Sequence, residues 1–440
     1  MKIKYHFRLI VVSFSILISG HLPAQNPSGD PSSAEELPLP SVADPIQAQS
    51  GEGEGVQVQY APALDGSGLI ALDRTRKSRM LLGGSFTTGW DSNQRNEKKG
   101  YPSGLLALSP FLGIQGSTGR RQFLLQYAPT FVSNYGSNVS SSQTLNRASA
   151  QMAGILSERW QLKFDADASY GQDSLRLLVP PQGVVVGEIP GIGPNAAAYR
   201  RDAGKVTAIE GGMEVQYAKS ARDLVALQVG DSYTHFSGLG GNNSVATTRL
   251  SYDRRLSPTF GLGAYGDIYY DYGSVNCTSL GGGIEAKWMV RERTSLQMGG
   301  GPQVNSAACG NQMGFAFNTA FSTRLSAKSQ LYALASRQFG TNYLGPGLWQ
   351  DNVSAGYQRQ VGSAGALGLD LGYSHSAARA TAGSYNGVYF EGSFNRQLGH
   401  QCFSTVTYRR YSGNTGGGSF SRDVAMFLLS WTPNTGHIFK

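Results

Sequence analysis

The sequence predicts an all-β chain: a single transmembrane, antiparallel, up-and-down β-barrel of about 18 strands (16–18), preceded by a signal peptide and a disordered linker. Three observations support this prediction: strand-length segments that alternate apolar and polar residues, tight turns that alternate with longer connections, and an export signal at the N-terminus. Strands that cross a lipid bilayer must close into a barrel, because lipid offers no partners for an open row of backbone hydrogen-bonding groups.

The N-terminal segment, residues 1–24, has the layout of a secretory signal peptide. Lys2, Lys4 and Arg8 precede an apolar run over residues 9–18, which is too short for a membrane-spanning helix. Residues 25–78 are rich in Pro, Ser, Gly and acidic residues and predict a flexible periplasmic linker, since such a composition buries no core. The barrel is predicted over residues 79–440.

Residues 281–301 show the unit that the remaining sequence repeats. Apolar residues such as Ile284 and Trp288 share one parity, whereas Glu285 and Lys287 share the other. Strict alternation has the period of a β-strand, and one polar turn interrupts it. The stretch therefore predicts an antiparallel hairpin with one apolar and one polar face.

The connections between strands alternate in length. Tight turns are predicted near residues 118–121, 157–159, 219–222, 257–258, 291–294, 326–329, 362–365 and 398–401. Longer connections are predicted near residues 91–101, 134–143, 173–202, 238–243, 273–278, 305–311, 340–350, 376–384 and 412–419. Outer-membrane barrels have short turns on the periplasmic side and longer loops outside, so the alternation favours a barrel over a soluble sandwich.

Composition excludes other classes of function. Among 440 residues, 58 are Gly and only 15% are charged, a balance that is unusual for a soluble protein of this size. The net charge of +8 does not indicate a nucleic-acid partner, because Lys and Arg are scattered over turns and polar strand faces.

From residue 79 onward, the chain resembles a Gram-negative outer-membrane β-barrel of the porin type. The final strand carries Phe427, Leu429 and Trp431 on one face, similar to the closing strand that the barrel-insertion machinery reads. The chain departs from the pattern because it continues to Lys440 instead of ending on an aromatic residue. The resemblance implies a location in the bacterial outer membrane, with lipid, lipopolysaccharide and the insertion machinery as partners and the N-terminal arm in the periplasm.

The polar strand faces supply charged residues that would line an aqueous lumen. They are Lys163, Asp165, Asp167, Arg249, Asp253, Asp267, Glu285, Lys287, Asp370, Glu391, Arg396 and Arg409. Because both signs are mixed, strong selectivity for ions of one sign is not implied. The predicted function is a porin-like channel for passive diffusion of small hydrophilic solutes.

Two alternatives remain open on the sequence alone. The same charges could pair between strands inside a plugged barrel, which would then be a structural or adhesive surface protein without a through-pore. Trp90-Asp91-Ser92-Asn93 gives a weaker likeness to barrels associated with exopolysaccharide export, which implies a polysaccharide conduit. The sequence carries no signal for an oligomeric state.

No catalytic, cofactor-binding or metal-binding motif is present in the sequence, so an enzyme is not predicted. The glycine clusters lack the Lys of a phosphate-binding loop. His235 and His375 are candidates for a catalytic role at a barrel rim, but no nucleophile, base and orienting group can be assembled around either residue.

Two further predictions concern loops. Cys277 and Cys309 fall in neighbouring external loops, where a disulfide is plausible in an exported protein, whereas Cys402 lies beside a turn at the opposite end and is expected to be unpaired. The longest connection, residues 173–202, is predicted to fold inward and narrow the lumen, with Glu188, Arg200 and Arg201 at the constriction. Its alternative is an external hairpin that simply extends the flanking strands.

Overall fold

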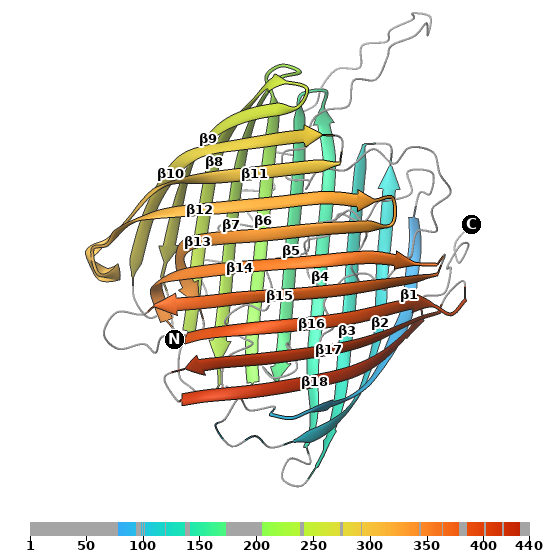
Figure 1. Ribbon diagram of the computed structural model, residues 1–440. Helices are drawn as coiled ribbons and strands as arrows, with labels where there is room; N and C mark the ends of the chain where they lie inside the picture. Colours follow the sequence, from blue (N-terminus) through green and yellow to red (C-terminus); the bar gives the residue numbers. More distant parts are fainter. Residues whose placement is uncertain are drawn as a thin grey trace, which may run out of the picture. The chain divides into compact units, whose positions relative to one another are not determined.

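A computed structural model describes residues 78–93, 98, 100, 102–118, 120–136, 141–172, 205–237, 242–272, 276–291, 293–342, 345–362, 364–377, 385–399, 402–415 and 418–431. The predicted signal peptide and linker lie outside the described residues, apart from Ser78. Among these residues, no helix is long and apolar enough to cross a membrane. The predicted all-β fold is confirmed, and its strands form one antiparallel sheet (Figure 1).

The described part of the chain contains 18 strands. Their bounds are β1 Ser78–Asp91, β2 Ser103–Thr118, β3 Arg121–Tyr135, β4 Ser141–Ser157, β5 Trp160–Gln172, β6 Lys205–Ala218, β7 Asp223–Phe236, β8 Asn242–Ser257, β9 Phe260–Asp271, β10 Cys277–Arg291, β11 Thr294–Asn305, β12 Met313–Ser326, β13 Ser329–Asn342, β14 Gly345–Val361, β15 Gly365–Ala377, β16 Tyr385–Gln397, β17 Cys402–Thr415 and β18 Gly418–Trp431.

Each strand pairs with its neighbours in sequence, and β1 pairs with both β2 and β18. The sheet is therefore a closed up-and-down barrel with the predicted number of strands. Figure 1 shows the later strands crossing the earlier ones on the opposite wall. Closure removes both sheet edges, so the backbone groups of the first and last strands find partners.

Most strands have an apolar outer face and a largely polar inner face, although the strands beside β1 also carry buried apolar side chains inside. On β10, Ile284 is 66% exposed and Trp288 47% exposed on the outer face, whereas Glu285 between them on the inner face is only 8% exposed. The outer parity of the other strands likewise carries large exposed hydrophobic residues, such as Phe131 and Leu371. The alternation of the sequence thus places apolar side chains outside and polar side chains inside.

The tight turns predicted from the sequence lie together at one end of the barrel. In three of them, the serine that ends one strand accepts a hydrogen bond from the backbone N–H two residues later: Arg159 to Ser157 Oγ at 3.3 Å, Thr259 to Ser257 Oγ at 3.2 Å and Lys328 to Ser326 Oγ at 3.2 Å. This local bond compensates for the backbone partner that is lost where the chain reverses.

Two of the predicted long connections are wrong. Pairing between β13 and β14 reaches Asn342 with Gly345, and pairing between β17 and β18 reaches Thr415 with Gly418, so only two residues separate the paired strands at each place. Composition rich in Gly and Asn suggested loops over 340–350 and 412–419. Gly418, with a φ of 109°, shows that such residues serve a tight reversal at the end of a paired hairpin.

The barrel closes where β1 pairs with β18, called here the seam. Of all neighbouring strands in the ring, these two share the fewest residue pairs. The seam contains eight residue pairs, from Gly84 with Trp431 to Asp91 with Val424, whereas β1 forms 14 pairs with β2. Next to the last of these pairs, Asp91 with Val424, Arg422 Nε donates to both carboxylate oxygens of Asp91 at 3.1 Å. The side chains of Arg422 and Asp91 are 1% and 3% exposed.

The residues after Asp91 extend this contact. Asn93 Nδ2 donates to the carbonyl of Ser421 at 3.0 Å, and its backbone N–H donates to Asp91 Oδ1 at 2.9 Å. The backbone N–H of Ser92 donates to the carbonyl of Asp423, whose own N–H donates to Ser92 Oγ. Asp91, Ser92 and Asn93, together with Arg422, form what we call the seam latch. Three of the four residues of the motif Trp90-Asp91-Ser92-Asn93 therefore have a structural role in closing the barrel.

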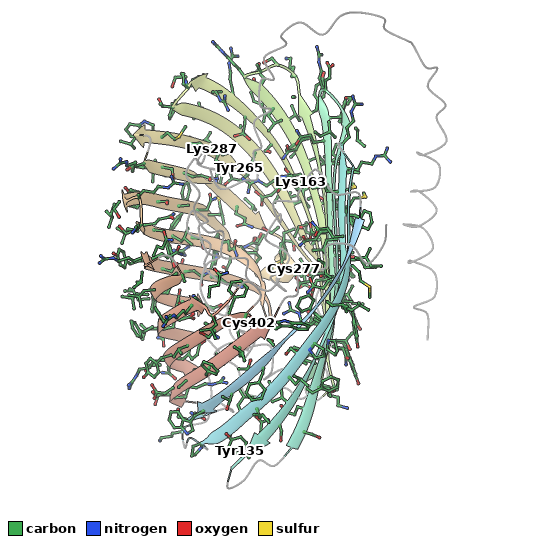
Figure 2. The ribbon with its side chains drawn as sticks, turned by 90° about the vertical axis from the view of Figure 1, so that its right-hand side faces the viewer. Tyr135, Lys163, Tyr265, Cys277, Lys287 and Cys402 are labelled. Atoms are coloured by element: carbon green, nitrogen blue, oxygen red, sulfur yellow. A yellow bond between two sulfur atoms is a disulfide. The ribbon has the colours of Figure 1, made fainter. Side chains whose placement is uncertain are left out.

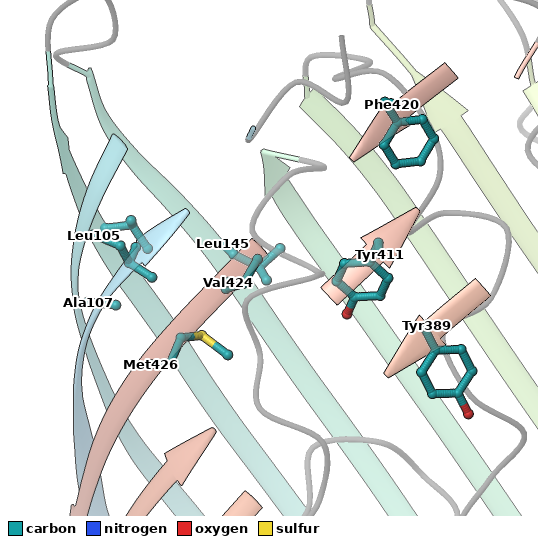
Figure 3. Close-up of a cluster of buried hydrophobic side chains, with 9 residues drawn as sticks. Leu105, Ala107, Leu145, Tyr389, Tyr411, Phe420, Val424 and Met426 are labelled. Carbon is teal, nitrogen blue, oxygen red and sulfur yellow. The ribbon is translucent and has the colours of Figure 1, made fainter. Parts of the chain in front are cut away.

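Apolar side chains on the inner face flank the seam latch. They come from the strands on either side of β1 and are buried (Figure 3): Leu105, Ala107, Val132, Leu145, Tyr389, Tyr411, Phe420, Val424 and Met426. This cluster and the latch hold both sides of the seam with contacts additional to the eight backbone pairs.

Removing one charge of the seam latch should destabilise the barrel. The variant Asp91→Asn leaves Arg422 buried without its counter-charge, so we expect the free energy of unfolding to fall by about 3–5 kcal/mol. The control Arg254→Gln removes the 3.8 Å pair with Asp223, in which Arg254 is 58% exposed, and should cost about 1 kcal/mol or less. Denaturant titration in detergent, followed by tryptophan fluorescence, measures both; equal losses would contradict a special role for the latch.

Candidate functional site, the inner face of the barrel

The inner face contains all but one of the charged residues predicted to line a lumen. Strand parity places there Lys163, Asp165 and Asp167 of β5, Arg249 and Asp253 of β8, Asp267 of β9, Glu285 and Lys287 of β10, Asp370 of β15, Glu391 of β16 and Arg409 of β17. Lys163, Tyr265 and Lys287 can be located in Figure 2.

Arg396 is the exception, and its assignment to the lumen is wrong. It shares the outer parity of β16 with the exposed Val388, Phe390 and Phe394, and it pairs in register with Ser404 at the tight-turn end of β17. A charge at the end of a strand can sit on the outer face because its long side chain reaches the water at the membrane boundary. The position of Arg396 at the end of its strand therefore explains why a charged residue lies on the outer face.

The charges of β8 to β10 form a network across the middle strand. Arg249 Nη2 lies 3.2 Å from Glu285 Oε2, and Lys287 Nζ lies 3.3 Å from Asp253 Oδ1 and 3.9 Å from Glu285 Oε1. The guanidinium of Arg249 also stacks over the ring of Tyr265, with 4.0 Å to the centroid. Side chains of β8 and β10 can reach each other across β9 because the inner-face glycines of β9 and β10 have no side chains to fill the space between these residues.

The opposite wall carries more deeply buried pairs. Arg409 Nε lies 2.8 Å from Glu391 Oε2, and the Arg409 side chain is only 6% exposed. Asp370 accepts hydrogen bonds from the hydroxyl of Tyr332 and, at 3.4 Å, from that of Tyr389. These side-chain contacts connect β13, β15, β16 and β17 on the inner side of the wall.

Between these two regions, the inner faces of β11 to β14 are almost entirely polar and uncharged. They present amides and hydroxyls from Gln297, Gln303, Asn318, Ser322, Gln330, Ser336, Gln338, Gln350, Asn352, Ser354, Gln358 and Gln360. Arg324, near the tight-turn end, is the charged inner-face residue among the described side chains of these four strands. Groups of this kind both donate and accept hydrogen bonds without attracting ions of one sign.

Sequence reasoning missed several inner-face residues. Arg422 and Asp91 could have been found, because Arg422 has the parity opposite to the outward Phe427 and Trp431. Arg147, which lies 3.8 Å from Asp167, was hidden because the apolar alternation of β4 is weak. The position of Tyr332 over Asp370 depends on packing across two strands and gave no sequence signal.

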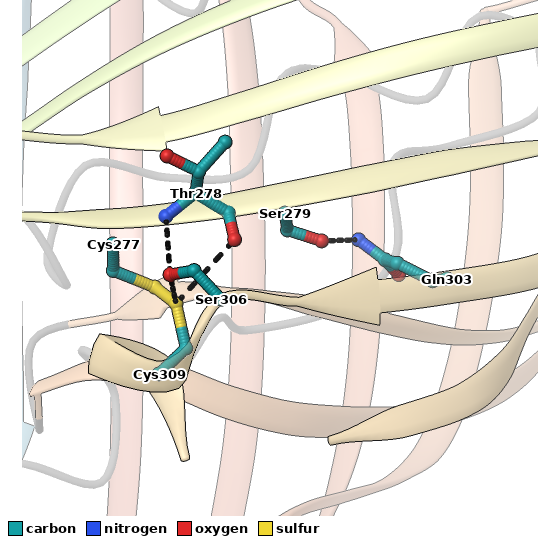
Figure 4. Close-up of a disulfide and its surroundings, with 6 residues drawn as sticks. All are labelled: Cys277, Thr278, Ser279, Gln303, Ser306 and Cys309. Atoms are coloured by element: carbon teal, nitrogen blue, oxygen red, sulfur yellow. Dashed lines mark hydrogen bonds between the residues drawn. A yellow bond between two sulfur atoms is a disulfide. The ribbon is translucent and has the colours of Figure 1, made fainter. Parts of the chain in front are cut away.

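The two loop cysteines are joined. Cys277 and Cys309 form a disulfide with their Cα atoms 5.3 Å apart (Figure 4). Cys402 is a free cysteine. Cys309 ends the short 3₁₀ turn Ala307–Cys309 that connects β11 to β12. The predicted constriction residues Glu188, Arg200 and Arg201 lie outside the described residues, so their role stays a prediction.

The histidines are not brought together. His235 is on β7 and His375 is on β15, on different walls of the ring, and the ring of His375 stacks on Tyr373 with centroids 6.4 Å apart. In the part of the chain that the structure describes, no three His, Cys, Asp or Glu residues are grouped so that they could hold a metal ion.

Three features decide the class of the protein. The sheet closes on itself, its outer face carries large exposed hydrophobic side chains from every part of the ring, and its inner face carries charges, amides and hydroxyls. A soluble barrel would have the opposite polarity. The chain has the polarity of a membrane-spanning β-barrel.

No family model and no curated protein matches the sequence. Among solved structures, the barrel is similar to Pseudomonas aeruginosa OccK9 (OpdG), with 12% identity, a TM-score of 0.47 and coverage of 81% of this chain and 98% of that one. Acinetobacter baumannii OccAB4 has 8% identity and a TM-score of 0.44, with coverage of 82% of this chain and 100% of that one. The A. baumannii siderophore receptor PirA has 8% identity and a TM-score of 0.43, with coverage of 82% of this chain and 81% of that one. These identities are too low, and the superpositions too loose, to transfer a function to this chain.

A charge on the outer face should be costly, whereas the same charge on the inner face should not. We expect Ile284→Arg, near the middle of β10, to lower the free energy of unfolding by about 2–4 kcal/mol, because the new charge would face hydrocarbon. Asn318→Arg places the same side chain on the inner face near the middle of β12 and should be close to neutral. Unfolding in lipid vesicles compares the two; similar losses would contradict the assignment of the faces.

Proposed function

We propose that the protein is a channel of the bacterial outer membrane through which small hydrophilic solutes diffuse passively. The observation that carries the proposal is the polar inner face of a closed ring of 18 strands. Strands spaced about 4.8 Å apart and tilted by about 40° give a ring roughly 35 Å across, which is wider than inner-face side chains can fill from both walls. The short turns would then face the periplasm and the longer loops the exterior, with lipid and lipopolysaccharide around the apolar outer face.

The charges of the inner face support weak selectivity between ions. Several of them neutralise one another in pairs, including Arg249 with Glu285, Lys287 with Asp253 and Arg409 with Glu391. A paired charge exerts a smaller field on a passing ion than an isolated one does. The solutes best matched to the amide-rich wall of β11 to β14 are neutral and rich in hydroxyl groups, because each such group can both donate and accept.

The seam latch weakens the case for polysaccharide export. The sequence likeness to export-associated barrels rested on Trp90-Asp91-Ser92-Asn93, and Asp91, Ser92 and Asn93 contact β18 to close the barrel. Their presence is therefore explained by barrel closure. The proposal is that of a diffusion channel and not of an enzyme or an export conduit.

Conductance of the purified, folded protein in a planar bilayer tests the channel. We expect stable steps of current that scale linearly with voltage, as for an open aqueous pore. Folded protein that inserts without any current would refute the channel and favour a structural surface barrel.

Breaking the network on β8 to β10 should shift ion selectivity in a defined direction. Glu285→Gln removes the carboxylate that Arg249 and Lys287 share, so the lumen gains net positive charge and should pass chloride more readily relative to potassium. The reversal potential in a KCl gradient reports this shift. Glu158→Gln, in the exposed turn between β4 and β5, is the control and should leave the reversal potential unchanged. A shift towards potassium would contradict the inner-face position of Glu285.

A further inference from the structure

The hairpin of β13 and β14 separates from β12 near the end of the barrel opposite the predicted tight turns. Pairing between β12 and β13 stops at Phe317 with Arg337, although β12 itself continues to Met313 in its pairing with β11. Pairing between β13 and β14 continues past this point to Asn342 with Gly345. Residues 338–342 and 345–350, called here the rim hairpin, therefore extend beyond the pairing with β12 at the end opposite the predicted tight turns, while β14 stays paired with β15 as far as Trp349 with Ala377.

The rim hairpin rests on the inner side of β10 to β12. The backbone N–H of Phe339 donates to Gln303 Oε1 at 3.3 Å, and Gln303 Nε2 donates to Ser279 Oγ at 2.8 Å. Gln303 and Ser279 are inner-face residues of β11 and β10, 4% and 0% exposed. A backbone group of β13 thus reaches a side chain two strands away, which is possible only if the hairpin turns inward over the wall.

The aromatic side chains of the rim hairpin fix its position. Phe339 is 3% exposed and packs against Cys277 and Cys309, and it meets Trp349 edge-on with ring centroids 5.6 Å apart. Trp349 Nε1 donates to Gln312 Oε1 at 3.1 Å. The ring of Trp349 lies against Gly314 on the inner face of β12, where a Cβ atom would be only 2.1 Å from Cζ2. Glycine at this position is therefore required for the Trp349 ring to sit there.

The surface on which the rim hairpin packs is itself held in place by a disulfide and by hydrogen bonds. Residues 306–312, called here the seat, connect β11 to β12 and are tied to β10 by the disulfide from Cys309 to Cys277 (Figure 4). Ser306 N–H donates to the carbonyl of Thr278 at 2.8 Å, and Thr278 N–H returns a bond to Ser306 Oγ at 3.1 Å. The seat cannot move away from β10 without breaking a covalent bond.

We propose that the rim hairpin narrows the mouth of the channel and that the disulfide-bonded seat holds it there. Phe339 and Trp349 are the positioning residues, and the Cys277–Cys309 bond fixes the surface on which they pack. The inference rests on the proposed channel function. Two strands folded over the wall occupy roughly 10 Å of an opening about 35 Å across, so the hairpin restricts the mouth without closing it.

The test displaces the hairpin without changing its sequence. Gly314→Ala puts a Cβ where the Trp349 ring lies, and the double variant Cys277→Ser, Cys309→Ser unlocks the seat. In both variants, we expect faster deuterium exchange of the Phe339 amide and a rise in single-channel conductance of about 1.5-fold, because the open cross-section grows. Gly266→Ala is the matched control on the outer face of β9, where a Cβ meets nothing closer than 3.9 Å, and should change neither quantity.

The two readouts separate the possible failures. Unchanged exchange of the Phe339 amide in both variants would overturn the docking of the hairpin on the seat. Faster exchange with unchanged conductance would overturn its role as a constriction. If the wild-type protein carries no current at all, the channel proposal fails, whereas the exchange measurement still decides whether the seat holds the hairpin.

Discussion

Backbone hydrogen bonding in lipid is the constraint on which the rest of this structure depends. Every N–H and C=O group on a membrane-crossing strand needs a partner within the sheet, so the first and last strands must find each other across more than 300 residues of sequence. They do so through only eight residue pairs, between β1 and β18. The seam latch of Asp91, Ser92, Asn93 and Arg422 lies where this short pairing ends and fixes its register.

The same constraint separates the two faces. Once closure satisfies the backbone, the outer side chains need only be apolar, whereas the inner ones are free to carry charge in an environment that water can reach. The chain uses this freedom unevenly. Ion pairs gather on β8 to β10 and on β16 to β18, and amides and hydroxyls cover β11 to β14. A solute that enters would pass a charged wall and a neutral hydrogen-bonding wall at the same level.

The fold could be predicted because its signal is local. A period of two residues, repeated at Ile284 and Trp288 and on most other strands, fixes which side chains face outward, and serine-containing turns mark the chain reversals. The errors come from effects at strand ends. Arg396 lies on the outer parity of β16 at a strand end, where a charge can reach water, and the glycines near 345 belong to a paired hairpin and not to a loop.

The candidate site was predictable only in part, for a related reason. Parity identifies which residues point inward, but it does not reveal which partners they meet across two or more strands. The contacts of Tyr332 with Asp370 and of Trp349 with Gly314 depend on such distant packing. The disulfide was accessible to sequence reasoning because the hairpin of β10 and β11 brings its two cysteines to the same end of neighbouring strands.

Liposome swelling is the most direct test of the central claim that a polar path runs through the barrel. Vesicles containing the folded protein are diluted into isotonic solutions of neutral sugars of increasing size, and swelling is followed by light scattering. Swelling that is fast for the smallest sugar and slows steadily as the sugar becomes larger is the predicted result. Vesicles that contain folded protein but do not swell with any sugar would contradict the account.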